Sequence, residues 1–107
     1  MIYEFKTYNA TEGNIDALKK RFQEKTMPIF SRLGIQVTHC WDCIDNPNSF
    51  SYLVCFPNKE AEKAAWDAFA SDEEWKTVKA ESEKVNGPLL ASQSTSYLSS
   101  TNFSPNA

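Results

Sequence analysis

Histidine and glycine are scarce in this sequence, and their scarcity removes several classes of enzyme. The 107 residues include one histidine and three glycines. One histidine cannot build an H-E-x-x-H zinc site, and three dispersed glycines cannot form the glycine-rich loop that holds phosphates. No G-x-S-x-G motif marks a nucleophilic serine. If the protein is an enzyme, it works without an obvious nucleophile.

Long apolar runs and an excess of basic residues are also missing. No run of about eighteen apolar residues exists, and the N-terminus lacks the basic start and apolar core of a signal peptide. We therefore expect a cytoplasmic protein with no membrane insertion. The formal net charge of −3 argues against a nucleic-acid partner, because phosphates require a clustered basic face. We interpret the short basic run at 19–21 as a solvated helix face.

The three cysteines are too few for a disulfide scaffold, and their odd number fits a reducing compartment. Cys40 and Cys43 form a C-x-x-C directly after His39, with Cys55 as the third. On a strand, Cys40 and Cys43 would project to opposite faces, because no glycine or proline between them makes a turn. Asp42 would favour the neutral thiol over a reactive thiolate. We therefore predict no metal site and no redox centre.

Strand and helix patterns do alternate along the chain, which we expect to form one domain over residues 1–107. The expected order is β-α-β-β-α-α-β, an α+β ferredoxin-like βαββαβ fold with the second helix split in two and a four-stranded antiparallel sheet. The predicted elements are strand 2–8, helix 15–33, strands 35–44 and 49–57, helices 59–70 and 72–85, and strand 89–100. The helices of such a fold cover one face of the sheet.

Capping residues and one proline mark the predicted helices. Asn14 and Asn58 are expected to cap the first and second helices, and Ser71 with Glu74 has the spacing of a capping box for the third. Pro28 lacks an N–H and clashes with the preceding turn, so it should bend the first helix or divide it.

The first strand predicts which residues the helices leave uncovered. Tyr3 and Phe5 are the better apolar partners for the helices, so we expect Ile2, Glu4, Lys6 and Tyr8 on the bare face. A bare face that mixes aromatic and charged residues usually meets a second copy of the chain, a ligand, or both.

Three segments of the chain together resemble the NIPSNAP family. They are "MIYEFKTYNATEGNIDALKKRF", "CFPNKEAEKAAWDAFASDEEWKTVKAESEKVNGPL" and "STNFSP". The most specific features are the aromatic-Pro strand end, the "AAW-x-x-F" helix, the "D-x-E-W" that opens the next helix, and "ESE" followed by "GPL". The resemblance implies a ferredoxin-like protomer that pairs through its open sheet faces into a dimeric α/β barrel. It also places the chain in a superfamily of cofactor-free monooxygenases, haem-degrading enzymes and EthD-like proteins, so we expect no cofactor.

The resemblance also implies positions for a site. The family's polar set falls on Glu4, Lys6 and Tyr8, and its aromatic positions fall on Trp41, Trp66 and Trp75. The last two also lie at helical spacing with Phe69, and we interpret all three as core residues.

The chain departs from the family pattern at three positions. Lys6 stands where an arginine is usual, so the planar guanidinium that could bind a carboxylate through two hydrogen bonds is missing. His39 stands where a small residue is expected and would narrow the pocket. Lys25 replaces a histidine that is common in the first helix.

Two functions remain open from the sequence. The first is binding of a small organic molecule between sheet and helices, with cofactor-free oxygenase-type or acid–base chemistry by Glu4, Tyr8 or His39. The expected ligand contacts are Glu4, Lys6, Tyr8, His39, Trp41 and Tyr52. The second is a non-enzymatic scaffold in which the homodimer itself binds partners.

The alternation of the second strand leaves open whether His39 and Trp41 or their neighbours face the pocket.

Overall fold

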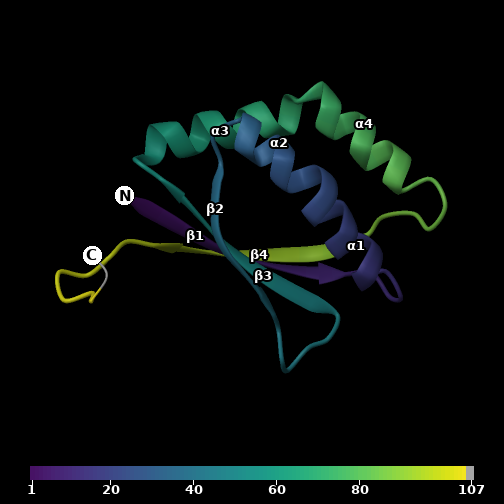
Figure 1. Ribbon diagram of the computed structural model, residues 1–107, viewed down its shortest axis with the longest axis horizontal. Coiled ribbons are helices and arrows are strands. Elements are labelled where there is room, and N and C mark those ends of the chain that lie inside the picture. Colours follow the sequence, from purple (N-terminus) through teal and green to yellow (C-terminus); the bar gives the residue numbers. More distant parts are fainter. Residues whose placement is uncertain (106–107) are drawn as a thin grey trace.

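A four-stranded antiparallel sheet with all helices on one face makes up the computed structural model, which describes residues 1–105 (Figure 1). The sheet order is β2-β3-β1-β4, which confirms the predicted ferredoxin-like arrangement. The segment after β4 extends away from the sheet (Figure 1). The elements are β1 (Ile2–Ala10), α1 (Ile15–Arg21), η1 (Phe22–Thr26), α2 (Met27–Arg32), β2 (Gln36–Asp42), β3 (Ser49–Phe56), α3 (Lys59–Ser71), α4 (Glu73–Ser82) and β4 (Leu90–Leu98).

A π-helical turn lies directly before Pro28 in the first helical segment. Proline cannot donate a backbone hydrogen bond within the helix, and it crowds the turn before it. The preceding segment η1 is a π-helix, in which the backbone N–H of Met27 donates to the carbonyl of Phe22, five positions earlier. The predicted interruption is therefore present as a widened turn between α1 and α2.

Helices α1 and α3 begin differently from one another. Asn58 caps α3 as predicted, because its Oδ1 accepts a hydrogen bond from the backbone N–H of Ala61 at 2.8 Å. Asn14 precedes α1, but its side chain makes no capping bond and instead donates to Thr11 Oγ1 at 2.7 Å. The predicted Asn14 cap is wrong because the threonine hydroxyl in the preceding turn competes for the amide.

The capping box predicted at Ser71 is also wrong. Ser71 is the last residue of α3, and its hydroxyl donates to the carbonyl of Asp67 at 3.0 Å. The cap of α4 is Asp72, whose Oδ2 accepts from the backbone N–H of Trp75 at 2.9 Å. Aspartate caps as well as serine does, and Asp72 also binds the Arg32 guanidinium, so it holds α4 and α2 together.

The helices cover the face of β1 that we expected to be bare. Glu4 is 2% exposed and accepts a hydrogen bond from Trp66 Nε1, whereas Phe5 contacts Trp41 on the open face at 5.7 Å between ring centroids. The prediction that Tyr3 and Phe5 lie under the helices is therefore wrong. The face with more polar groups is buried because helix side chains supply the hydrogen bonds that those groups need.

A β-bulge in β2 settles which of its residues face the helices. The register with β3 shifts between Val37 and His39, so Thr38 is the additional residue. Val37 packs against the core, and the shift sends Cys40 to the helix side as well. His39 and Trp41 lie on the open face. The sequence left open which alternate set of β2 residues faces the helices. Val37 of one set does so before the bulge, and Cys40 of the other set does so after it.

The core lies between the sheet and the helices and is rich in aromatic rings. Phe22 contacts the rings of Phe30, Phe50 and Tyr52 at 4.7 to 5.9 Å between centroids. The buried residues of the core also include Leu18, Ile35, Val54, Phe56 and Leu89. The candidate site lies beside this cluster, because Phe22 also lines it.

Candidate functional site

A partly enclosed cavity of about 350 Å³, here named the inner chamber, lies where β1 and β4 meet the helical layer. It is more enclosed than the groove beside β2 described below. The chamber is lined by Tyr8, Leu18, Arg21, Phe22, Thr26, Phe69, Trp75, Lys79, Glu83, Pro88, Leu90 and Gln93. Its walls are thus mostly apolar and aromatic, with a few charged and hydrogen-bonding groups, which is the usual composition of a small-molecule pocket.

Two tyrosines form a hydroxyl chain at the chamber wall. Tyr52 is fully buried and donates to Tyr8 Oη at 2.7 Å, which leaves the proton of Tyr8 free to be donated elsewhere. Burial raises the pKa of Tyr8, although the Tyr52 hydrogen bond and the Arg21 charge partly oppose this. Burial also raises the pKa of Tyr52. Both phenols are therefore protonated at neutral pH, and Tyr8 acts as a hydrogen-bond donor toward the chamber.

Arg21 is the buried cation of the chamber. It is 7% exposed, and its Nη1 donates to Ser82 Oγ and to Glu83 Oε2, each at 3.1 Å. The guanidinium carbon lies 5.2 Å from the ring centroid of Trp75. Our interpretation of residues 19–21 as a solvated face is therefore wrong for Arg21. Its position three residues after the buried Leu18, on the same side of the helix, was the signal that pointed inward.

The π turn places residues of η1 at the chamber. Thr26 Oγ1 donates to the backbone carbonyl of Arg21 at 3.4 Å, and both residues line the cavity. A π turn accommodates one extra residue, so it changes which side chains lie above one another on the helix. Such turns occur often at functional sites. Pro28 thereby influences the chamber without lining it.

A second polar cluster lies closer to the start of β1 and beneath α3. Glu4 Oε2 accepts from Trp66 Nε1 at 2.7 Å, and Glu4 Oε1 lies 3.5 Å from Lys6 Nζ. Lys6 Nζ also donates to Thr95 Oγ1 at 3.0 Å and lies 4.8 Å from the Trp66 ring centroid. Glu4 and Lys6 are thus a buried ion pair and not the solvated pair that is common on protein surfaces.

Glu62 adds a second carboxyl group to this cluster. The neighbouring carboxylate of Glu4 raises the pKa of Glu62, because a protonated Glu62 can donate a hydrogen bond to it; burial and the negative charge of Glu4 raise the pKa further, against the opposing charges of Lys59 and Lys6. The Oε2 atom of Glu62 is buried and has no hydrogen-bond partner among residues 1–105. A cavity of about 390 Å³, here named the outer cavity, borders Glu4, Glu62, Trp66 and Tyr97.

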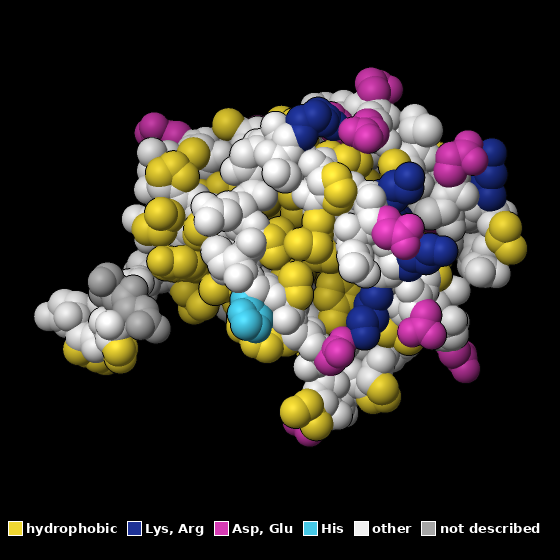
Figure 2. Space-filling view, in the orientation of Figure 1, with side chains coloured by type: hydrophobic (Ala, Val, Ile, Leu, Met, Phe, Trp, Pro, Cys, Tyr) yellow, Lys and Arg dark blue, Asp and Glu magenta, His cyan; other side chains and the backbone are white. Residues whose placement is uncertain are grey.

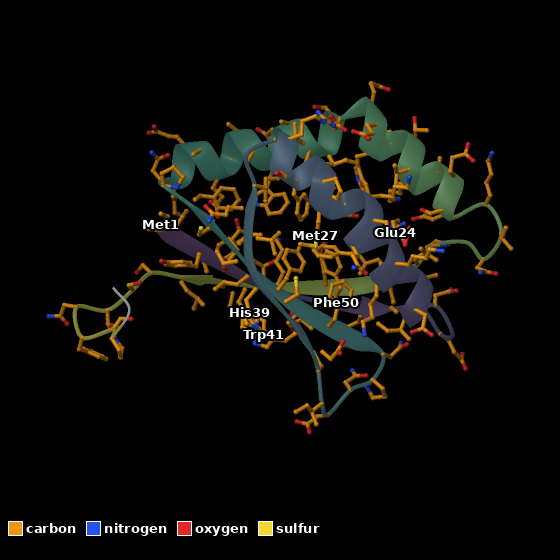
Figure 3. The ribbon with its side chains drawn as sticks, viewed as in Figure 1. Met1, Glu24, Met27, His39, Trp41 and Phe50 are labelled. Carbon is orange, nitrogen blue, oxygen red and sulfur yellow. The ribbon has the colours of Figure 1, made fainter. Side chains whose placement is uncertain are left out.

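The expected site residues thus divide between the two faces of the sheet. Glu4, Lys6, Tyr8 and Tyr52 lie between sheet and helices, but of these four only Tyr8 lines the inner chamber. His39 and Trp41 lie on the opposite face and stack on each other at 4.3 Å between centroids (Figure 3).

A groove of about 360 Å³ separates β2 from α1 and η1 and has apolar side chains at its floor (Figure 2). Met27 and Phe50 lie on the helix side of the sheet there (Figure 3). Trp41 borders this groove at the edge of the sheet, whereas His39 does not. The structure therefore does not bring His39 into a pocket with Tyr8.

The cysteines have the geometry that the sequence predicted. Cys40 lies opposite the buried Tyr52, whereas Cys43 Sγ is 3.5 Å from Ser51 Oγ, so the two thiols project to different faces. Burial raises the pKa of the Cys40 thiol, which disfavours a thiolate. Within residues 1–105, no group of three or more His, Cys, Asp or Glu side chains is arranged to hold a metal ion. Over the same residues, no helix has the length and apolar character needed to cross a membrane.

Sequence analysis missed several residues of the two cavities. Trp66 and Phe69 pack against the core as interpreted, but Trp66 is also a hydrogen-bond donor to Glu4, and Trp75 lines the inner chamber. Glu62 lies four residues before Trp66 on the same side of α3, which is the signal that would have placed it beside Glu4. Gln93 lay in an alternating polar strand and had no distinguishing signal.

Comparisons with solved structures identify the class of protein. A NIPSNAP domain protein from Burkholderia xenovorans, itself uncharacterised, superposes with a TM-score of 0.82 at 22% identity, over 98% of this chain and 99% of that chain. A NIPSNAP family protein of unknown function from Agrobacterium tumefaciens gives 0.80 at 20% identity, over 98% and 92%. An antibiotic biosynthesis monooxygenase gives 0.65 at 12% identity, over 94% and 99%. These likenesses define a ferredoxin-like α+β fold.

The sequence itself shows the family. The NIPSNAP family model matches residues 3–105, and the chain therefore belongs to the NIPSNAP family. Among curated proteins, no sequence matches significantly.

Proposed function

We propose that this NIPSNAP protein binds a small organic molecule in the inner chamber. The observation that carries the proposal is the combination, in one partly enclosed cavity, of aromatic walls with the buried guanidinium of Arg21 and the hydroxyl of Tyr8. Apolar walls provide affinity, and a few fixed polar groups provide orientation and specificity.

Any chemistry in the chamber would involve Tyr8. Of the three candidate acid–base residues, Tyr8 alone lines the inner chamber, since Glu4 borders the outer cavity and His39 lies on the open face. A protonated phenol beside a guanidinium stabilises negative charge on a substrate oxygen. This supports acid–base or cofactor-free oxygenase-type chemistry as an extension of binding, with Glu4 and Lys6 retained as contacts for a ligand that reaches the outer cavity.

The test is binding of an aromatic probe to variants that close the chamber. Gln93 is exposed and lines the chamber, so Gln93→Trp fills the cavity without changing the core. Isothermal titration with 2-naphthamide should show binding to the wild type and at least about tenfold weaker binding to Gln93→Trp. Ala68→Trp, on the exposed side of α3, is the matched control and should bind like the wild type. Equal binding to all three proteins would place the probe elsewhere and contradict the proposal.

A homodimer through the open sheet face is the second proposed property, and a scaffold role for that dimer is the alternative function. The open face carries Phe5, Leu53 and Trp41, and Trp41 is 40% exposed. Apolar side chains grouped on an uncovered sheet face favour contact with a second apolar surface. The NIPSNAP resemblance implies the same pairing.

A cytoplasmic location is proposed as well, supported by three cysteines that form no disulfide.

A further inference from the structure

The charged residues of the inner chamber have a net positive charge, although the chain as a whole is acidic. Its charged lining residues are Arg21, Lys79 and Glu83, which sum to one positive charge, whereas the whole chain has a formal net charge of −3. Glu83 Oε2 lies 3.1 Å from Arg21 Nη1 and 3.7 Å from Lys79 Nζ, so one carboxylate serves two cations. The chamber therefore retains one uncompensated cation, which favours an anionic ligand.

Arg21 has hydrogen-bonding capacity that the protein does not use. Only Nη1 is bonded, to Ser82 and Glu83, and the other guanidinium nitrogens make no hydrogen bond to any residue of the described range 1–105. A guanidinium carries five N–H donors in a planar fork that matches the two oxygens of a carboxylate. Among residues 1–105, these unbonded nitrogens are not sealed in the core, so they remain accessible to a ligand carboxylate.

Tyr8 supplies a second donor at the same cavity. Its oxygen is already the acceptor for Tyr52, so its own proton is available to a ligand oxygen. Arg21 is close enough for its charge to lower the pKa of Tyr8. An oxyanion can therefore bind the guanidinium and the phenol together, as anion sites in proteins often combine charged and neutral donors.

The chamber walls favour a flat apolar body behind that anionic group. The rings of Phe69 and Trp75 stack at 4.8 Å between centroids with an interplanar angle of 29°, and Arg21 lies over the ring of Trp75. Phe22 and Leu90 line the same cavity. Planar aromatic surfaces pack well against these rings, whereas a highly hydroxylated ligand would leave its donors without partners.

We propose that the ligand of the inner chamber is a small planar organic acid, with its carboxylate on Arg21 and Tyr8 and its apolar body against Phe22, Phe69 and Trp75. This inference rests on the proposed function, because it names the class of molecule that the chamber binds. It excludes neutral aromatic compounds and organic cations as preferred ligands.

The experiment compares two probes of equal shape, 2-naphthoate and 2-naphthamide, by isothermal titration at neutral pH. The wild type should bind the acid at least about tenfold more tightly than the amide, as expected for a hydrogen bond to a charged partner. Equal affinity for both probes would overturn the inference and leave the proposed function standing. If neither probe binds, both fail.

Charge variants locate the preference at the chamber. Arg21→Gln should abolish the preference for the acid, and Glu83 keeps Lys79 as an ionic partner in that variant. Glu83→Gln should increase the preference, because it removes the carboxylate that competes for Arg21. Tyr8→Phe should weaken the preference for the acid, because it removes the second donor to the carboxylate. If Arg21→Gln does not fold, the opposite responses of Glu83→Gln and Tyr8→Phe still test the inference. An undiminished preference for the acid in Tyr8→Phe, or an unchanged preference in Glu83→Gln, would overturn the inference.

Discussion

The hydroxyl pair of Tyr8 and Tyr52 illustrates how a single hydrogen bond serves both folding and the candidate site. Tyr52 is fully buried, and its proton is directed to Tyr8 at 2.7 Å. A buried donor without an acceptor is costly, so the bond fixes the Tyr8 ring. The same bond leaves the proton of Tyr8 available to the chamber.

A double-mutant cycle tests this pair. Tyr8→Phe should lower the free energy of unfolding by about 1–3 kcal/mol, because it leaves the buried Tyr52 hydroxyl without a partner. Tyr52→Phe together with Tyr8→Phe should cost less than the sum of the two single changes, because neither donor nor acceptor is then left unpaired. Urea denaturation measures all four proteins. Strictly additive effects would show that the two hydroxyls are not coupled.

Glu62 gives the stability of the protein a defined pH dependence. Its pKa is raised above the ordinary value of 4.5 in the folded chain, so the native state binds the proton more tightly than the unfolded state. The free energy of unfolding should therefore fall as pH rises from the ordinary pKa through the raised one. Glu62→Gln should remove this fall and be more stable than the wild type at neutral pH.

The measurement for Glu62 is a set of urea midpoints across mildly acidic to neutral pH. The two proteins should converge at a pH below 4.5, where the carboxyl is protonated in both states of the wild type. Glu60→Gln removes a charge from an exposed position of the same helix and is the matched control. A pH slope of Glu62→Gln equal to that of the wild type would show that Glu62 does not hold its proton.

At the scale of elements, the junction of α3 and α4 depends on Asp72. Its carboxylate accepts two hydrogen bonds from Arg32 Nη2, each at 2.8 Å, and one from the backbone N–H of Trp75. These contacts connect α2 to the start of α4, and α4 carries Trp75 to the inner chamber. A helix cap thus positions a wall of the site.

Replacing the cap should loosen α4. Asp72→Ala should lower the free energy of unfolding more than Ser71→Ala, because Ser71 does not cap α4. The hydrogen bond with Arg32 lowers the pKa of Asp72 below 3.8, so the stabilisation is complete above that value and is lost as pH falls through the lowered pKa. Thermal unfolding of both variants at neutral pH checks the order. A larger effect of Ser71→Ala would restore the capping box that the structure lacks.

Element types were predictable from the sequence, whereas the assignment of faces was not. The alternation around Glu4 correctly predicts a strand, but it cannot say which side is buried when both sides mix polar and aromatic residues. The answer depends on Trp66, which lies sixty-two positions away and supplies the donor for Glu4. Hydrogen-bond partners of this kind are decided by tertiary structure, and no local pattern reports them.

The candidate site was predictable only in part for a similar reason. Tyr8 and Tyr52 were expected in a pocket between sheet and helices; both lie between sheet and helices, but only Tyr8 lines the inner chamber. His39 lies on the opposite face because the bulge at Thr38 shifts the alternation of β2. Arg21 was missed because a basic run is usually solvated.

At the scale of the whole molecule, the two faces of the sheet have different proposed roles. The helix-covered face holds the chamber, and the open face is proposed to pair with a second copy. Leu53→Asp places a charge on the open face opposite Phe5 and should convert a wild-type dimer into monomers in sedimentation velocity experiments. Ala68→Asp, on the exposed side of α3, should remain dimeric. A wild type that sediments as a monomer would contradict the pairing.

The most direct test of the account is proton–nitrogen correlation NMR of the indole groups during a titration with 2-naphthoate. The three tryptophans report on three places: Trp75 on the inner chamber, Trp66 on the outer cavity and Trp41 on the open face. The account predicts that the Trp75 signal moves, and saturates, while the Trp41 signal stays in place. Movement of the Trp41 signal with an unchanged Trp75 signal would contradict the central claim that the inner chamber is the binding site.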